Sequence, residues 1–87
     1  MITAKLLQSL WATKKIDGLG GMKFMLAEEV GGSDERRRIV VVDTIGGGIG
    51  DLVIVCTGSA ARKALGNDQL PVDAAVVGII DEDCEIK

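Results

Sequence analysis

Four glycines fall within five positions of the chain, in the segment that runs from Asp43 to Asp51. This segment separates two apolar runs, Ile39–Val42 and Leu52–Cys56, which are typical of buried strands. Glycine loses much conformational freedom on folding, so a cluster of glycines indicates a positive φ or a close approach of another backbone. The usual partners of such a loop are a phosphate, a metal-held ligand or a second copy of the same chain.

The composition predicts one small domain over residues 1–87 with an aliphatic core. Hydrophobic residues make up 47% of the 87-residue chain, with one Phe, one Trp and no Tyr. The core must therefore consist of Val, Ile, Leu, Ala and Met. A chain of this size buries only about 60% of its unfolded surface. We therefore expect part of the remaining aliphatic surface to be covered by a contact between subunits.

The charge pattern disfavours nucleic acid as a partner. The net charge is −3, and the one basic cluster, Arg36–Arg38, directly follows Asp34 and Glu35. A nucleic-acid-binding domain usually has a basic face and aromatic side chains that stack on bases. The sequence offers neither of these features, and it assigns no role to the arginine cluster.

Cysteine usage and hydropathy predict a cytoplasmic protein without metal or membrane contacts. The two cysteines, Cys56 and Cys84, are not in a Cys-x-x-Cys motif, and the chain has no His. We expect free thiols, as in a reducing cytosol, because this set leaves zinc short of ligands. No apolar run approaches the roughly 18 residues that a membrane-spanning helix needs, and the N-terminus lacks a signal-peptide pattern.

The apolar patterns predict an all-β chain with one short helix, folded as a small five-stranded OB-like β-barrel. The expected strands are Ile2–Thr13, Met22–Val30, Arg38–Val42, Leu52–Thr57 and Val72–Asp81, and the expected helix is Ser59–Leu65. Gly31–Asp34 is expected to form a hairpin turn, Ser59 to cap the helix and Gly66 or Asn67 to end it. The run from Ala74 to Ile80 has no polar residue, so we expect both of its faces to be covered, the second by another subunit.

The motifs of common catalytic sites are absent, so we expect neither an enzyme nor a cofactor. A phosphate loop needs a lysine near its glycines and a helix after them, whereas Asp51 and a strand follow here. Asp43 and Thr44 are instead expected to bond to nearby backbone N–H groups as the chain leaves a strand. Arg62 is either an exposed helix residue or the partner of a carboxylate across a subunit boundary.

Four stretches of the sequence together resemble the EutN/CcmL family, the pentameric vertex proteins of bacterial microcompartment shells. They are Trp11–Lys15, Asp43–Asp51, Gly58–Arg62 and Pro71–Asp81, with further matches at Leu19 and Gly21–Lys23. The resemblance covers nearly the whole chain. The sequence departs from the family where Gln8 replaces a frequent glycine, Gly47 a frequent alanine and Ala60 a frequent second serine.

The resemblance implies a barrel that assembles into a cyclic homopentamer. Such a ring closes the corners of a polyhedral shell tiled mainly by hexameric shell proteins, so the implied function is structural and the implied location is the microcompartment shell. A narrow pore on the ring axis would fit this function. The alternatives are a single-stranded nucleic-acid-binding OB-fold domain and a small enzyme subunit.

Two sets of residues are the candidates for this assembly. The loop residues Gly46, Gly47 and Gly48 are expected to line or flank an axial pore, because a crowded symmetry axis tolerates bare backbone. The residues expected at the subunit interface are Arg62, Asp73, Ala74, Ala75 and Gly78.

Overall fold

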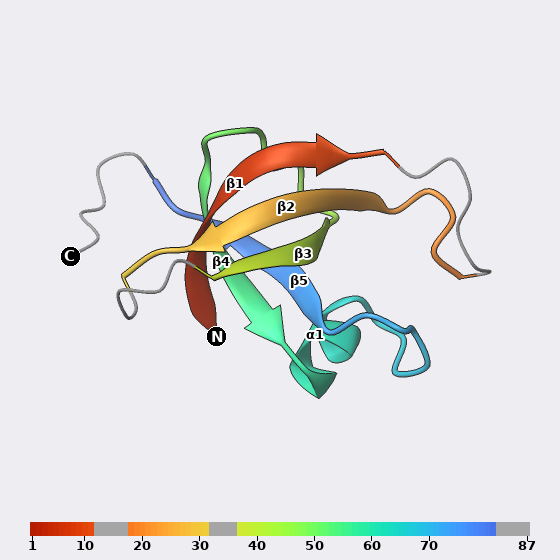
Figure 1. The fold of residues 1–87 in the computed structure, drawn as a ribbon. Helices are drawn as coiled ribbons and strands as arrows, with labels where there is room; N and C mark the ends of the chain where they lie inside the picture. Colours follow the sequence, from red (N-terminus) through yellow and green to blue (C-terminus); the bar gives the residue numbers. More distant parts are fainter. Residues whose placement is uncertain (12–17, 32–36, 82–87) are drawn as a thin grey trace.

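A computed structural model describes residues 1–11, 18–31 and 37–81 of the chain, which form a closed β-barrel with one short helix (Figure 1). The elements are β1 (Ile2–Leu10), β2 (Lys23–Glu29), β3 (Arg38–Asp43), β4 (Leu52–Thr57), α1 (Ser59–Ala64) and β5 (Ala74–Ile79). The strands follow one another around the barrel in the order β1-β2-β3-β5-β4, and β4 pairs with β1 to close it. This arrangement confirms the prediction of a small five-stranded OB-like barrel.

Most of the predicted strands agree with the structure, but the first and last are shorter than expected. β1 ends at Leu10, and β5 occupies only the middle of the predicted run from Val72 to Asp81. β2 and β3 pair in antiparallel register, as the predicted hairpin requires. The end of the first predicted strand at Thr13, the tip of the hairpin and Cys84 lie outside the described residues.

The barrel interior is aliphatic, as the composition predicted. Period-two alternation points one face of each strand inward, which buries Ala4 and Leu6 of β1 and Val53 and Val55 of β4 completely. The other members of this core are Met25, Ala27, Val41, Ala74 and Val76. Phe24, the one phenylalanine, lies outside it and packs instead in a second cluster around Val42, Leu70 and Val72.

Helix α1 forms after β4 and ends in a Schellman motif. The N–H of Gly66 donates to the carbonyl of Lys63 at 3.0 Å, and the N–H of Asn67 donates to that of Arg62 at 3.2 Å. Gly66 has φ +79°, a left-handed conformation that suits glycine, so its predicted role is confirmed. The prediction for Ser59 is wrong, because Gly58 precedes the helix at the cap position and no side chain caps the first turn.

The outer face of β5 is covered by the chain's own helix at its beginning. Ala75 is fully buried and packs with Cys56 of β4 and Ala61 of α1. The expectation that another subunit covers the second face is therefore wrong at this position, where a small residue makes room for the helix. Further along, Val77 and Ile79 are partly exposed, so that end of β5 does present apolar surface. Cys56 has a free thiol, as predicted.

Candidate functional site

The glycine-rich segment crosses one end of the barrel, from the end of β3 to the start of β4. It also reaches β1, because the N–H of Gly50 donates to the carbonyl of Leu6 at 2.8 Å. In return, the N–H of Leu6 donates to the carbonyl of Asp51 at 2.9 Å. These bonds hold the far end of the loop against a strand that is not its neighbour in sequence. We call residues 44–50 the glycine loop.

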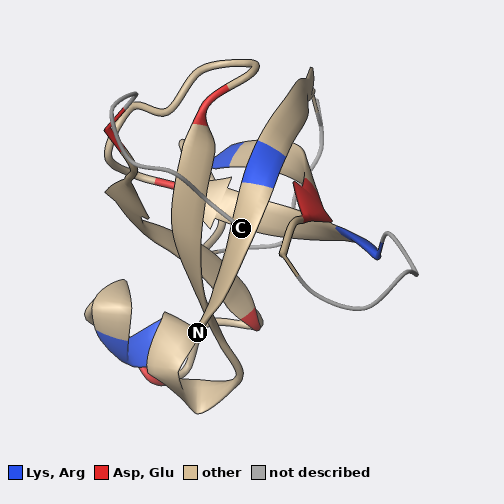
Figure 2. Cartoon of the chain, turned by 90° about the vertical axis from the view of Figure 1, so that its left-hand side faces the viewer, with Lys and Arg blue, Asp and Glu red and all other residues tan. Residues whose placement is uncertain are grey.

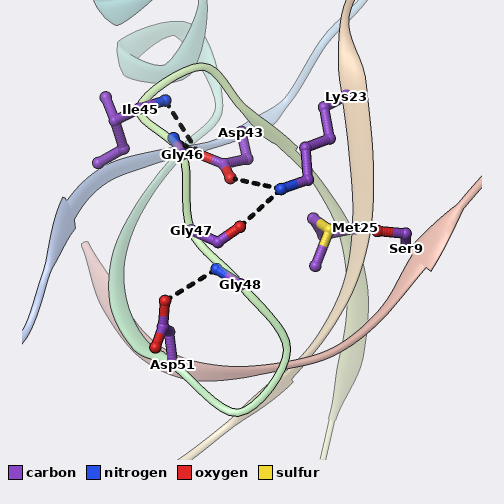
Figure 3. A network of polar contacts seen from close by, with 9 residues as sticks. All are labelled: Ser9, Lys23, Met25, Asp43, Ile45, Gly46, Gly47, Gly48 and Asp51. Atoms are coloured by element: carbon purple, nitrogen blue, oxygen red, sulfur yellow. Dashed lines mark hydrogen bonds and ion pairs between the residues drawn. The ribbon is translucent and has the colours of Figure 1, made fainter.

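Asp43, the last residue of β3, holds the near end of the glycine loop. Its Oδ1 atom accepts hydrogen bonds from the N–H groups of Ile45 at 3.0 Å and Gly46 at 3.1 Å (Figure 3). The side chain is buried, so these bonds replace the water that a carboxylate would otherwise bind. The prediction that Asp43 bonds to local backbone where the strand ends is confirmed.

Lys23, the first residue of β2, holds the middle of the glycine loop. Its Nζ atom donates to the carbonyl oxygen of Gly47 at 2.6 Å and lies 3.5 Å from Oδ2 of Asp43. Figure 3 shows the ammonium group between the two acceptors. Within the described part of the chain, Oδ2 of Asp43 makes no hydrogen bond, so this ion pair is what compensates its burial. Reasoning from sequence missed Lys23, although it lies in one of the family-like stretches.

The loop glycines serve two different needs. Gly46 has φ +95° and Gly50 has φ +91°, in the region that side chains with a Cβ rarely adopt. Gly47 instead allows a close approach, because a Cβ there would lie 2.8 Å from Cδ1 of Leu6. The cluster predicted positive φ angles or the close approach of another backbone. The first occurs at Gly46 and Gly50, whereas the close approach at Gly47 is made by the side chains of Leu6 and Asp43. Neither need requires a phosphate or a metal.

Replacing Gly46 by alanine is expected to destabilise the protein by about 1–2 kcal/mol, the cost of a left-handed conformation for a residue with a Cβ. The matched control is Gly48→Ala. Gly48 does not have a positive φ, and its Cβ would lie 3.7 Å from the nearest atom, an ordinary contact. Chemical denaturation of both variants checks this prediction, which equal losses of unfolding free energy would contradict.

The predicted interface residues differ in their burial and in their contacts. Ala74 and Ala75 are buried within the chain itself, Ala74 in the barrel core and Ala75 beneath α1. Packing inside the chain therefore accounts for their small size without a neighbouring subunit. Asp73 is exposed, and its carbonyl accepts from the N–H of Gly58 at 2.8 Å.

Arg62 and Gly78 complete the predicted set. The guanidinium Nη1 of Arg62 donates to the carbonyl of Val72 at 3.2 Å, which ties α1 to the segment before β5. Gly78 pairs with Ile54 of β4, and a Cβ on Gly78 would lie 3.6 Å from Cδ1 of Ile54. A role for these residues between subunits remains a prediction.

Several large apolar side chains are exposed, and sequence reasoning did not single them out. Trp11 is 93% exposed just after β1, beside a surface cavity of about 330 Å³ between the end of β1 and the start of β2. Ile49 is 70% exposed in the glycine loop, and Val40 is 52% exposed on β3. Val40 lines a second surface cavity of about 320 Å³, together with Asp73 and Ala74. The surplus of aliphatic residues in the composition was the only sequence signal for such surfaces.

The described residues hold no group of three or more side chains suited to a metal ion. Their one helix is too short to cross a bilayer. In the view of Figure 2 the basic segments are separated and interspersed with acidic ones. Arg38 pairs across strands with Glu28 at 3.1 Å (Nε to Oε2). The distinctive features of the described surface of this small barrel are thus a fixed glycine loop and exposed aliphatic side chains.

Comparison with known proteins identifies the family. The family model described as "Ethanolamine utilisation protein EutN/carboxysome" matches residues 1–81. The carboxysome shell vertex protein CcmL of Synechocystis sp. is 42% identical over 83 residues, covering 93% of this chain and 83% of that protein. The bacterial microcompartment shell vertex protein GrpN of Rhodospirillum rubrum is 39% identical over 87 residues, with 93% of each chain covered. This chain belongs to the EutN/CcmL family.

Solved structures agree with this assignment. The structure of the GrpN pentameric microcompartment shell protein from Rhodospirillum rubrum matches with a TM-score of 0.80 and 33% identity, covering 99% of this chain and all of that one. The structure of CcmL from Nostoc sp. matches with a TM-score of 0.83 and 42% identity, covering 93% of this chain and 89% of that one. The resemblance found in the sequence is therefore confirmed.

Proposed function

We propose that this protein forms the pentameric vertices that close the polyhedral shell of a bacterial microcompartment. The observation that carries the proposal is the likeness to a solved pentameric shell protein, GrpN, over nearly the full length of both chains. The relatives named as shell vertex proteins support the same role. The function is structural, and we assign the protein no catalytic activity.

Geometry explains why a shell needs such a component. A sheet tiled only by hexagonal units is flat, and it closes into a polyhedron only where fivefold units replace sixfold ones. A ring of five copies is built from one heterologous contact repeated around the axis, in which one flank of each subunit meets a different flank of its neighbour. We propose that the hexameric proteins of the same shell surround this ring.

Within the ring, we propose that Gly46, Gly47 and Gly48 approach the axis and border a narrow pore. Their support is the loop's position across one end of the barrel, where Gly46 and Gly48 are exposed, whereas Gly47 is buried against the side chains of Leu6 and Asp43. Arg62, Asp73 and Gly78 remain our candidates for the subunit boundary. Asp73 lines a surface cavity beside the exposed Val40, which gives a neighbouring subunit apolar surface to cover.

Native mass spectrometry tests the assembly directly. We expect a discrete species containing five copies of the 9.1 kDa chain at micromolar concentration. Coexpression with hexameric shell proteins, followed by electron microscopy, tests the vertex role. Closed polyhedra should form with this protein, and open sheets or tubes without it. A chain that stays monomeric at micromolar concentration, or shells that close equally well without it, would contradict the proposal.

A further inference from the structure

The glycine loop exposes two isoleucines, and none of its own residues is charged. Ile49 is 70% exposed and Ile45 is 48% exposed. No charged residue occurs between Asp43 and Asp51. The cores of protein interfaces are depleted of charge in the same way. The exposed parts of these side chains do not stabilise the isolated barrel, because their apolar surface remains in water.

The same loop is fixed at its beginning, middle and end. Asp43 accepts two N–H groups at the beginning, and the backbone bonds with Leu6 fix the end. The carboxylate of Asp51 also accepts from the N–H of Gly48 at 2.8 Å. In the middle, the ammonium of Lys23 reaches over the barrel end to the carbonyl of Gly47 (Figure 3). These contacts restrain a glycine-rich backbone, whose freedom would otherwise have to be lost on binding.

We infer that the glycine loop is a preformed contact surface for a second copy of this chain, with Ile45 and Ile49 as its apolar anchors and Lys23 as its positioning residue. This inference rests on the proposed pentamer and specifies one of its contacts. The ammonium group of Lys23 contacts both the carbonyl of Gly47 and the buried carboxylate of Asp43. This one side chain therefore fixes the position of the loop relative to the end of the barrel.

Two observations favour a second copy over another occupant. The matching solved GrpN is described as pentameric and is covered over its whole length, so a chain of this fold meets copies of itself. A ring contact of this kind needs apolar area on the surfaces of each subunit that face its neighbours. The exposed isoleucines of the loop supply such area at one end of the barrel.

Substitution of Ile49 tests the contact surface. We expect Ile49→Ser to weaken the ring about ten- to hundredfold, the factor that corresponds to burying one aliphatic side chain. Ile49→Val, which keeps the apolar character, should remain close to wild type. Dilution series followed by mass photometry give the concentration at which each ring dissociates. Because Ile49 is mostly exposed in the single chain, circular dichroism of dissociated Ile49→Ser should match that of the wild type.

Substitution of Lys23 tests the positioning role. We expect Lys23→Met to speed hydrogen exchange at the N–H groups of Ile45 and Gly46 by about tenfold or more, as for the loss of a hydrogen bond to a charged group. Exchange at core residues such as Val41 should not change, and Lys23→Arg, which keeps a cationic donor, should restore much of the protection. The control is Lys63→Met, since Lys63 is exposed on α1 at the other end of β4.

The outcomes separate this inference from the proposed function. A wild-type chain that forms no ring contradicts the proposed function. A wild-type ring whose dissociation is unchanged by Ile49→Ser leaves the vertex role intact and overturns the contact surface. Loop exchange that is the same in Lys23→Met and in Lys63→Met overturns the role of Lys23.

Discussion

Replacing Asp43 by alanine is expected to lower the free energy of unfolding by about 3 kcal/mol or more, because two hydrogen bonds to a charged acceptor are lost at about 1.5–3 kcal/mol each. The change leaves the N–H groups of Ile45 and Gly46 without the acceptor that they have now. The ion pair with Lys23 adds less, since that lysine side chain is 44% exposed and water replaces its partner. Urea denaturation of the wild type and the variant measures the difference.

The other aspartate that bounds the glycine loop provides the control. Asp51 also accepts a backbone N–H, that of Gly48, but this hydrogen bond is exposed. Asp51→Ala should therefore cost about 1 kcal/mol or less. Equal losses in the two variants would mean that the burial of Asp43 contributes nothing, and that the carboxylate is only one of two equivalent loop caps.

Gly78→Asp is expected to abolish the ring at micromolar concentration while leaving the barrel folded. A Cβ on Gly78 makes only an ordinary contact with Ile54, and Gly78 does not have a positive φ, so an isolated chain can accommodate the new side chain. In a ring that covers this part of β5, each subunit would bury an unpaired carboxylate, at an effective cost of several kcal/mol per charge. Native mass spectrometry and circular dichroism together report assembly and folding.

Gly78→Ala separates the effect of charge from that of size. The alanine variant adds the same Cβ without a charge, so we expect it to assemble. If the aspartate variant assembles as well as the alanine variant, Gly78 faces solvent in the ring and does not belong to the interface. An aspartate variant that fails to fold would contradict the expectation that the isolated barrel accommodates the side chain.

Much of the fold could be predicted from local patterns. The apolar run from Leu52 to Thr57 has the bounds of β4, and Arg38–Val42 is one residue short of β3, because short aliphatic runs between turn residues have few alternatives. The glycine cluster predicted positive φ angles or the close approach of another backbone. Positive φ angles occur at Gly46 and Gly50, whereas Gly47 is approached by side chains. The carboxylate of Asp43 also bonds as predicted.

What could not be predicted depends on residues far apart in the chain. Ala75 was expected to meet another subunit, but α1 folds back over it, a contact that no local pattern encodes. Lys23 was predicted only as part of the strand Met22–Val30, whereas its Nζ atom contacts the glycine loop, which follows the next strand. The exposure of Trp11 depends on where β1 ends and on what the barrel leaves uncovered.

The barrel closes between β3 and β5 through a single registered residue pair, Val42 with Ala75, whereas β3 shares six such pairs with β2. We expect the barrel to open first between β3 and β5. Each opening exposes the unpaired backbone groups of two strand edges, which can pair with the strand edges of another molecule. A newly made, unassembled subunit is therefore the form most vulnerable to strand exchange and aggregation. Incorporation into a closed shell would surround the barrel with neighbouring subunits and so limit the opening of the β3–β5 pairing, the weakest strand pairing of the isolated chain.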